Sequence, residues 1–560
     1  MTELNGEKMQ EEEASDSIQK IENLYPERKL PPEAIVTRVA PSPTGFAHLG
    51  FVYISLICQE ISRNTNGVFI FRLEDTDQKR EIKDSDTALL KALNVLDIKY
   101  DEGITLDGEE KGQYGPYRQT ERVPIYNAYI RDLIEKGMAY YCFMTEEEIE
   151  EIRKEQKKNN IKPGIYGQYS KWRDATPEDI RKQLELGTPY VVRFKWPEKH
   201  EILNHKDLSG KEYFFDTEQY KEDFVLQKSN GIPTYHLAHL IDDYLMKVNL
   251  VVRGNEWISS LPKHIMLHKA LGLKPPSYYH VPPIEILDPE TKGRRKLSKR
   301  KDPEANIFNL LKDGFPKDGI KTYLLWISTS EYDRQTQIQN KPIIPDFKLD
   351  PSMLKSGAGS LLDINRLKNI SREIIAQMSP EELSTNLLEW SKLYDLDFYN
   401  VISNSDKSYL QRCLETVNNP NRNRKDISKY TEIPEKIGFF YNEIYETLEY
   451  EISSIQNLPF ETIEKIINDF LNRYKEDNTL EDFVNIMKSI GATNGLALNK
   501  EELEKTNALG LWSMVPAIIR IAITKRNISP DLYECIRILG TRELENRMNQ
   551  LLNYLREKNG

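Results

Sequence analysis

Apolar runs alternate with an amphipathic segment in the first part of the chain. Residues 34–40 (AIVTRVA) are rich in β-branched side chains and predict a buried strand. Two prolines and a glycine in 41–45 predict a loop. The helical spacing of apolar residues predicts a helix over 51–63, and 68–73 (VFIFRL) predicts the next strand. Strand, helix and strand in this order predict a βαβ unit, so we expect an α/β nucleotide-binding fold.

The hydrophobic pattern changes twice further along the chain. Residues 115–223 alternate helical and strand patterns, and we interpret them as an insertion between two halves of the first domain. The apolar run at 248–252 (VNLVV) has buried-strand character and predicts the second half. Beyond about residue 370, amphipathic stripes such as 463–474 recur to the C-terminus, and strand signals are few. We therefore expect the last third to be all-helical.

These patterns predict a chain of five parts. They are 1–34 for an acidic N-terminal extension, 35–114 with 224–285 for a catalytic domain of the Rossmann type, 115–223 for an inserted α+β domain, 286–370 for a connecting region with the KLSKR loop, and 371–560 for the helical region. The extension contains three consecutive glutamates, and its acidity favours disorder over a binding role.

Composition and charge narrow the class of protein. The chain has 560 residues, of which 39% are hydrophobic and 29% charged, which is typical of a soluble globular protein with several domains. No apolar stretch approaches the roughly 18 residues of a membrane span. The N-terminus resembles neither a secretory nor a transit signal, so we expect a cytoplasmic protein and no membrane partner. The net charge of −11 argues against general coating of nucleic acid, DNA included, but allows a local RNA-binding face.

The first polar segment with candidate chemistry lies between the first predicted strand and its helix. It contains His48-Leu-Gly50. A helix N-terminus presents unpaired N–H groups and a positive dipole end, which suit a phosphate. His48 can donate to a phosphate oxygen, and Gly50 would let a nucleotide approach the backbone closely. Taken alone, the pattern is more typical of a structural turn with a surface histidine.

The second segment, 292–301 (KGRRKLSKRK), is densely basic within an acidic protein. Its basic residues are Lys292, Arg294, Arg295, Lys296, Lys299, Arg300 and Lys301. Such density points to a polyanion. Gly293 favours a mobile loop, which fits a lid that closes over a triphosphate. The alternative is a solvated basic loop or a localisation signal.

Together these two segments resemble the HIGH and KMSKS signatures of class I aminoacyl-tRNA synthetases. The wider match resembles glutamyl-tRNA synthetases, and it covers nearly all of the chain from about residue 35. The segments that carry it, in the family's order, are RVAPSPTGFAHLG, FRLEDTD, YGPYRQTER, GIPTYHLAHLIDD, VVRGNEW and KLSKRKDP, followed by DPSMLKSGAGSLLDINRL and SPDLYECIRILG.

The resemblance implies attack of the glutamate α-carboxylate on the α-phosphorus of ATP, with pyrophosphate leaving. The transition state is rich in negative charge, so the protein contributes mainly positioning and electrostatic stabilisation. By similarity, His48, Lys296 and Lys299 are the catalytic residues. His48, Gly50, Lys299 and Arg300 would bind ATP, which is expected to carry Mg²⁺ on its phosphates.

The resemblance also implies a glutamate site. The matching residues are Arg38, Ala40, Ser42, Glu74, Tyr235, His239 and Arg253. Arg38 suits the side-chain carboxylate as a bidentate partner, and Glu74 suits the α-amino group. The alternative for Arg38 is a salt bridge at the end of the strand. Glu74, Asp75 and Asp77 could instead cap the following helix.

Three departures from the family's pattern bear on these expectations. His239 stands where the family often has Asn, although a histidine could still donate to a carboxylate. Phe51 occupies the last HIGH position and cannot bind phosphate through its side chain. Some bacterial members hold zinc in the insertion, whereas this chain has only Cys142 there, with Met144, Tyr166 and Tyr169 nearby. One thiolate cannot make a tetrahedral site, so we predict no structural zinc.

The remaining regions are expected to bind tRNA. By similarity, the insertion would receive the acceptor end, 286–370 would contact the stem, and the helical region would read the anticodon, as in the bacterial type of the enzyme. Arg422, Arg424 and Lys425 are candidate anticodon contacts, but a charged helix connection explains them better. The expected partners are tRNA(Glu), glutamate and ATP, and the expected assembly is a monomer.

Several alternatives to glutamate charging of tRNA(Glu) stay open. The helical C-terminus argues against a glutaminyl-tRNA synthetase, whereas nothing in the sequence excludes charging of tRNA(Gln) with glutamate as well. The full-length anticodon region disfavours an enzyme that modifies a tRNA base. The presence of His48, Lys296 and Lys299 argues against an inactive scaffold.

Overall fold

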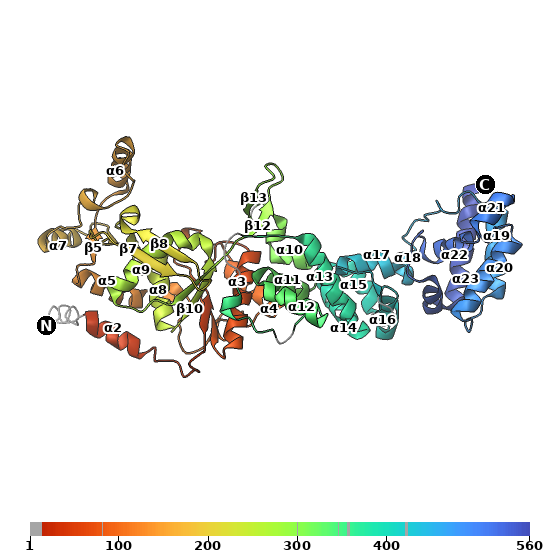
Figure 1. Cartoon of the computed structure of the whole chain (residues 1–560), viewed down its shortest axis with the longest axis horizontal. Helices are drawn as coiled ribbons and strands as arrows, with labels where there is room; N and C mark the ends of the chain where they lie inside the picture. The colour runs from red at the N-terminus through yellow and green to blue at the C-terminus, as the bar shows by residue number, and fades with distance from the viewer. Residues whose placement is uncertain are drawn as a thin grey trace. The chain divides into compact units, whose positions relative to one another are not determined.

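The computed structural model describes residues 14–80, 82–298, 301–344, 347–354, 359–419 and 424–559. The chain forms two compact units, Met1–Asn309 with Lys321–Asp363 and Leu310–Ile320 with Ile364–Gly560, and each is described by itself (Figure 1). Within the described ranges, no helix is both long and apolar enough to cross a membrane.

A parallel sheet forms the centre of the first unit. Its strands are β1 (Val36–Val39), β2 (Val68–Phe71) and β3 (Glu102–Ile104), with β4 (Glu110–Lys111) antiparallel at one edge, and β10 (Leu250–Gly254) paired in parallel with β11 (Ser277–Val281). The backbone N–H of Asn249 donates to the carbonyl of Val36 at 3.1 Å, so the β10–β11 pair lies beside β1. The two predicted halves therefore meet in one nucleotide-binding fold, as expected.

Helices flank this sheet. They are α3 (Leu49–Asn64), α4 (Ser85–Val95), α8 (Tyr235–Leu245) and α9 (Leu261–Leu271). Helix α3 connects β1 to β2 and completes the predicted βαβ unit, but it begins two residues before the predicted start. The reason is that His48 caps the helix, with its ring Nδ1 accepting from the backbone N–H of Gly50 at 2.9 Å. Histidine is not among the usual N-cap residues.

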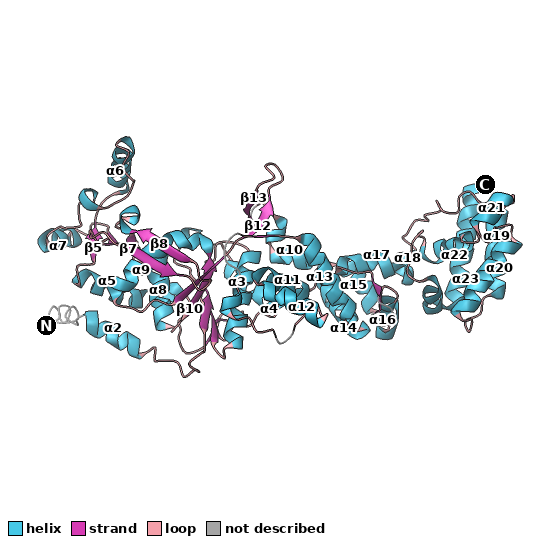
Figure 2. Ribbon diagram, viewed as in Figure 1, coloured by secondary structure: helices cyan, strands magenta, loops and turns pink. Residues whose placement is uncertain are grey.

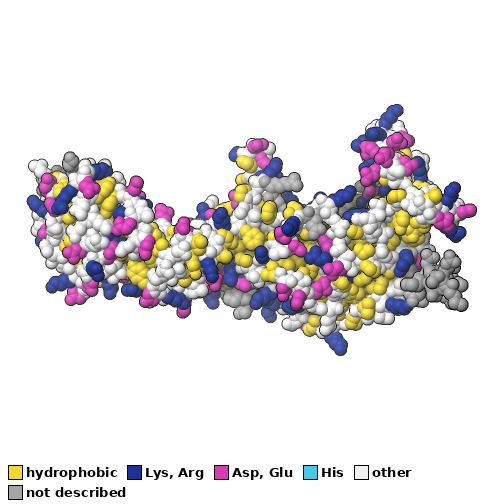
Figure 3. Space-filling model, turned by 180° about the vertical axis from the view of Figure 1, so that it is seen from behind, with side chains coloured by type: hydrophobic (Ala, Val, Ile, Leu, Met, Phe, Trp, Pro, Cys, Tyr) yellow, Lys and Arg dark blue, Asp and Glu magenta, His cyan; other side chains and the backbone are white. Residues whose placement is uncertain are grey.

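The insertion carries its own strands and helices. They are α5 (Val123–Glu135), β5 (Ala139–Cys142), α6 (Glu146–Lys158), α7 (Pro177–Glu185), β6 (Val191–Phe194), β7 (Ile202–Lys206), β8 (Glu212–Asp216) and β9 (Val225–Gln227). Strands β5, β6 and β9 form an antiparallel sheet, and β7 and β8 form a hairpin. Strand β9, which completes the β5–β6–β9 sheet, lies just past residue 223, the expected end of the insertion. Figure 3 shows acidic side chains gathered at α6, whose sequence begins with three glutamates.

Residues 14–34 of the N-terminal extension are ordered, which contradicts the expected disorder for this part of it. Helix α2 (Ala14–Asn23) packs against α5. After it, Arg28 forms a bidentate ion pair with Glu102 at 2.7 and 2.9 Å, and its guanidinium lies 3.8 Å above the ring of Tyr114. The hydroxyl of Tyr25 donates to the carbonyl of Gly115 at 2.9 Å. These partners are distant in sequence, so composition could not reveal them.

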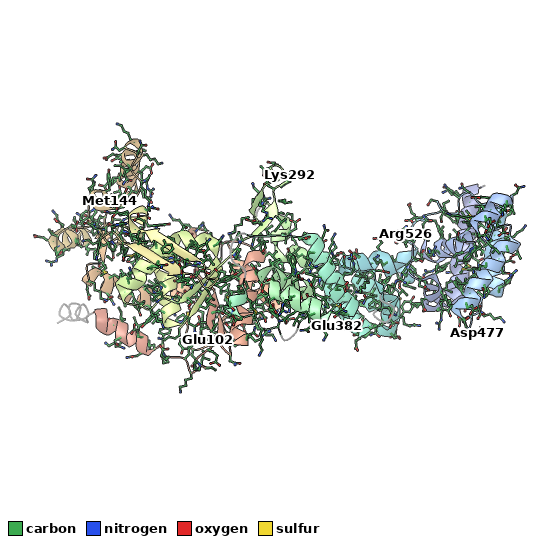
Figure 4. All side chains as sticks on the ribbon, in the orientation of Figure 1. Glu102, Met144, Lys292, Glu382, Asp477 and Arg526 are labelled. Carbon is green, nitrogen blue, oxygen red and sulfur yellow. The ribbon has the colours of Figure 1, made fainter. Side chains whose placement is uncertain are left out.

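The first unit ends with a hairpin, a short strand and helices. The elements are β12 (Ile284–Leu287), β13 (Arg294–Lys296), α10 (Ile307–Lys312), α11 (Lys317–Ser328), α12 (Ser330–Gln339) and β14 (Ser360–Leu361). Helix α10 ends with residues that belong to the second unit, and helix α11 begins with such residues. Strand β12 pairs antiparallel with β13 and parallel with β14. Figure 4 shows Lys292 at the turn of the β12–β13 hairpin.

The second unit is helical, as predicted (Figure 2). Its helices are α13 (Ile364–Gln377), α14 (Pro380–Tyr394), α15 (Leu396–Ser403), α16 (Lys407–Glu415), α17 (Ile433–Ile437), α18 (Asn442–Tyr445), α19 (Phe460–Arg473), α20 (Leu480–Thr493), α21 (Lys500–Lys505), α22 (Met514–Thr524) and α23 (Leu532–Asn559), which is kinked at Gly540. The predicted apolar stripe of α19 is buried at Ile463, Ile466, Ile467 and Phe470. Fully buried Arg547 donates to the carbonyls of Phe439 and Ile523 at 2.7 Å each.

The candidate anticodon contacts lie at a short strand pair in this unit. Strands β15 (Asn418–Asn419) and β16 (Arg424–Lys425) pair antiparallel within the connection between α16 and α17, where a charged connection between helices was expected. Arg424 pairs with Asp426 at 2.8 Å, and Lys425 pairs with Glu373 at 2.6 Å. Arg422 lies outside the described residues. The two described cations thus have structural partners.

Replacing Arg28 with alanine should release the N-terminal extension. The substitution leaves Glu102, which is mostly buried, without its cation, and breaking such a pair costs about 3–5 kcal/mol. We expect faster hydrogen exchange in α2 and a lower unfolding temperature. Lys29→Ala, at the exposed neighbouring position, is the matched control. Unchanged exchange in α2 of the Arg28→Ala variant would contradict this account.

Candidate active site

A cavity of about 690 Å³ opens at the carboxyl ends of the parallel strands of the first unit. This is the expected place for a ligand in such a sheet. The cavity is lined by most of the site residues predicted from the sequence: Arg38, Ala40, Ser42, His48, Gly50, Glu74, Tyr235, Arg253 and Lys296. Lys299 and Arg300 lie outside the described residues. His239 does not line the cavity.

One end of the cavity has the features of a phosphate site. His48 and Gly50 stand at the N-terminus of α3, where the positive end of the helix dipole suits a phosphate, and the N–H groups of Gly50, Phe51 and Val52 are bound by His48 itself. Because Nδ1 of His48 accepts from Gly50, the neutral ring carries its proton on Nε2, which is a donor. A Cβ at Gly50 would come within 3.1 Å of this ring, so a glycine keeps the capping histidine in place. Phe51 also lines the cavity and contributes apolar surface.

Two buried arginines share one carboxylate below the other end. Nε of Arg38 donates to Asp243 at 3.1 Å, and Nη1 of Arg72 donates to the same carboxylate at 2.8 Å. Burial would raise the pKa of Asp243, but the two guanidiniums lower it to about 2. Arg38 therefore has the salt bridge considered from the sequence and still lines the cavity. Sequence reasoning missed Arg72 and Asp243, although charged residues inside apolar runs were a signal for both.

Glu74 lies beside this pair and is only 4% exposed. Its carboxylate accepts from Nη2 of Arg72 at 3.1 Å. Burial raises the pKa of Glu74 to about 7, against the opposing effect of Arg72 and Arg38. The neighbouring Asp75 acts differently, because it accepts from the backbone N–H and hydroxyl of Thr120 at 2.9 and 2.6 Å. Asp75 thus binds the YGPYRQTER segment rather than capping the next helix.

His239, expected from the resemblance to contact the substrate, does not line the cavity. Its ring is fully buried and stacks on Tyr235 with centroids 4.4 Å apart, one layer behind the cavity. Nδ1 donates to the carbonyl of Tyr235 at 2.7 Å, since that oxygen can only accept. Burial lowers the pKa of His239 well below its usual value, so the ring is neutral and Nε2 is an acceptor. The residue cannot donate to a carboxylate from this position, and it supports the ring of Tyr235 instead.

Arg253 at the end of β10 provides a further cation. It is 4% exposed, and its guanidinium lies 4.5 Å from the centroid of the Tyr278 ring. Its Nη2 is buried and has no hydrogen-bond partner among the described residues. A buried donor of this kind is costly unless a ligand satisfies it.

The basic segment forms part of the cavity wall through β13. Lys296 lines the cavity and pairs with Glu256 at 2.8 Å. Arg295 is bound by Asp302 through two contacts of 2.7 Å and by Asp288 at 2.8 Å. Arg295 therefore stabilises the loop itself, whereas Lys296 faces the ligand space.

A buried carboxylate and an apolar cluster hold the insertion where zinc was considered. Cys142 is buried with Tyr140, Met144 and Ile165. Asp223, fully buried, accepts from Nη1 of Arg173 at 2.6 Å, and also from the Tyr140 hydroxyl, Ser170 hydroxyl and Trp196 backbone N–H at 2.9–3.0 Å. In the described part of the chain, no group of three or more His, Cys, Asp and Glu side chains could hold a metal ion.

A helix N-terminus with a histidine cap, a lysine-bearing strand and a charged pocket at the end of a parallel sheet together define a nucleotide-binding site of the class I synthetase type. Residues 34–360 match the family described as tRNA synthetases class I (E and Q), catalytic domain. The chain belongs to this family of class I tRNA synthetases for glutamate and glutamine.

Relatives extend the similarity to nearly the whole chain. A glutamate–tRNA ligase of Clostridium perfringens is 36% identical over 535 residues, covering 94% of this chain and 95% of the relative. One from Sorangium cellulosum is 36% identical over 561 residues, with 94% and 96% covered. The crystal structure of a glutamate tRNA ligase from Elizabethkingia meningosepticum in complex with its amino acid has the same fold, with a TM-score of 0.75, 23% identity and coverage of 93% and 99%.

Under the role that the family resemblance implies for Glu74, contact with the α-ammonium group, its pKa predicts that glutamate binding weakens in mild acid. A carboxylate attracts an ammonium group, and protonation of Glu74 below about pH 7 removes that attraction. The Michaelis constant for glutamate, measured at saturating ATP, should rise as the pH falls from 8 to 6, by at most about tenfold per unit below the pKa.

Glu74→Gln is the matched control for this pH dependence. The Michaelis constant of this variant for glutamate should be high and nearly constant between pH 8 and pH 6. A wild-type Michaelis constant that does not change between pH 8 and 6 would contradict the role of Glu74.

Proposed function

We propose that the chain is a glutamate–tRNA ligase, which activates glutamate with ATP to glutamyl-adenylate and transfers glutamate to the 3′ end of tRNA(Glu). The observation that carries this proposal is the cavity, where a phosphate-type helix N-terminus meets buried Arg38, Arg253 and Glu74. Relatives named glutamate–tRNA ligase, 36% identical over almost the full length, support it.

Activation requires a charge-stabilising environment for the triphosphate. The positive dipole end of α3 and the donor Nε2 of His48 would stabilise the phosphate oxygens, and Lys296 would approach from the hairpin. To do so Lys296 must leave Glu256 or share it, and the exposed position of this pair allows that. By similarity, Lys299 and Arg300 would assist. Mg²⁺ would arrive on the phosphates of ATP.

The charges around the amino acid match glutamate. A guanidinium binds a carboxylate through two parallel hydrogen bonds, which suits Arg38 and Arg253 for the two carboxylates of the substrate. Glu74 would bind the α-ammonium group, and the proximity of that cation would keep Glu74 ionised at neutral pH. Ala40, Ser42 and Tyr235 would shape the remaining walls.

The other regions would bind the RNA. The insertion would receive the acceptor end, residues 286–370 would contact the stem, and the helical unit would read the anticodon loop. Unstacked loops are the usual targets of sequence-specific RNA recognition. We further propose a monomeric cytoplasmic enzyme without structural zinc. Charging of tRNA(Gln) with glutamate is the second outcome to be tested.

Purified protein should charge tRNA(Glu) with glutamate in the presence of ATP and Mg²⁺. Parallel assays with tRNA(Glu) and tRNA(Gln), each with glutamate and with glutamine, show which amino acid and which RNA are the substrates. No charging of either RNA with glutamate would refute the proposal, whereas charging with glutamine alone would reassign the substrate.

Lys299→Ala should lower ATP–pyrophosphate exchange far more than tRNA binding.

The insertion should need no zinc. Atomic absorption of protein purified without chelator should give far less than one zinc per chain, and EDTA should leave the unfolding temperature unchanged. Asp223→Asn, in contrast, should destabilise the insertion by about 3 kcal/mol or more, because it leaves the guanidinium of Arg173 buried without its counter-ion. Stoichiometric zinc in the protein would overturn the zinc-free assignment.

A further inference from the structure

Two histidines hold the guanidinium of Arg253 from opposite sides. Nε of Arg253 donates to Nε2 of His280 at 3.1 Å, and Nη1 lies 3.1 Å from Nδ1 of His264. His280 is bound in turn by Asp207, whose carboxylate lies 2.6 Å from Nδ1. His264 continues to His236 at 3.1 Å. All five residues belong to the first unit.

The proton positions in this chain of contacts follow from the arginine, which can only donate. His280 and His264 must therefore each accept from Arg253 through an unprotonated ring nitrogen. The remaining proton of His280 lies on Nδ1 and is donated to Asp207. Burial lowers the pKa of His264 well below its usual value and also lowers the pKa of His280, so both rings stay neutral and keep their acceptor nitrogens.

Asp207 comes from the insertion rather than from the parallel sheet. It follows β7 and accepts from the backbone N–H groups of Ser209 and His280 at 3.0 Å each. Asp207 and His280 have side chains only 1% exposed. The hairpin of the insertion is thus connected to β11, and through His280 to the arginine at the end of β10.

Two of the three guanidinium nitrogens are used in this arrangement. Nη2 alone has no partner in the described structure, and the arginine lines the cavity. We propose that Asp207 and His280 are positioning residues, which orient Arg253 so that Nη2 meets a carboxylate of the bound amino acid. This inference rests on the proposed function and adds residues of the insertion to the amino-acid site.

Two other roles for this cluster fit the structure less well. A metal site would place a cation next to the guanidinium, and the described residues contain no group suited to a metal. A purely structural role would suit Arg72, Arg122 and Arg173, each of which also has one nitrogen without a hydrogen-bond partner in the described structure, but of these four arginines Arg253 is the one that lines the cavity. Orientation of a ligand-binding arginine accounts for both the histidine contacts and the unsatisfied Nη2.

The test is the Michaelis constant for glutamate in tRNA(Glu) charging, at saturating ATP and tRNA. His280→Phe keeps a ring but removes both hydrogen bonds, and Asp207→Asn removes the charge with little change of shape. Each should raise the Michaelis constant for glutamate by about tenfold to a hundredfold, as expected for one charge-assisted hydrogen bond. The Michaelis constant for ATP and kcat should change far less. His280→Gln, whose amide oxygen can accept from Arg253, should recover part of the loss.

Two controls separate positioning from a general loss of structure. His268 on α9 is equally buried and, in the described part of the chain, has no hydrogen bond to Arg253, so His268→Gln should leave the Michaelis constant for glutamate nearly unchanged. In an Arg253→Gln background, His280→Phe should raise the Michaelis constant for glutamate by less than a further factor of about two, because the arginine that His280 positions is absent.

The outcomes distinguish this inference from the proposed function. Wild-type protein that does not charge tRNA with glutamate would overturn the proposed function itself. Wild-type charging, with unchanged Michaelis constants for glutamate in both His280→Phe and Asp207→Asn, would overturn the positioning role alone. The positioning role would also be overturned if the effects of His280→Phe and Arg253→Gln on the Michaelis constant for glutamate were fully additive.

Discussion

The first unit depends on a buried group of charges centred on two adjacent carboxylates of α8, Asp242 and Asp243. Asp243 binds Arg38 and Arg72, and Asp242 binds Arg122 at 2.6 Å, with Glu74 as the third carboxylate beside Arg72. Every member is at most 4% exposed. Three arginines face three carboxylates, which matters because a buried charge without a partner costs several kcal/mol. Since burial raises the pKa of Glu74 to about 7, that carboxylate is only partly ionised at neutral pH. This group of charges joins α8, which belongs to the second half of the split domain, to β1 and β2, which belong to the first half.

Under the proposed function, this group of charges would prepare the cavity for a charged amino acid. Arg38 and Glu74 are held in place before a ligand arrives, so binding requires little reorganisation. Asp242 extends the group away from the cavity, since Arg122 also donates to the hydroxyl of Tyr25 at 3.1 Å. The N-terminal extension, the split catalytic domain and the amino-acid pocket are therefore parts of one continuous hydrogen-bonded structure.

Two buried aspartates, Asp223 and Asp207, organise hydrogen bonds in the insertion. Asp223 gathers four side-chain and backbone donors of the insertion around one buried carboxylate, and the apolar packing of Cys142 and Met144 completes that region. Asp207 connects the β7–β8 hairpin to His280 and hence to Arg253. In both places a single aspartate organises a segment, because a carboxylate can accept several hydrogen bonds at once.

The sequence alone determined the βαβ unit, the split by an insertion, the helical last third and most of the residues around the cavity. The first three follow from hydrophobic periodicity, whereas the residues around the cavity follow from the resemblance of short motifs to those of a known family. Only the tertiary structure decided that residues 14–34 dock, that α3 begins at a capping histidine, and that His239 lies behind Tyr235. The ordering of the extension depends on pairs such as Arg28 with Glu102, and the role of His239 depends on which face of α8 meets the sheet. A buried charge or ring obtains its function from partners distant in sequence, and folding alone brings those partners together.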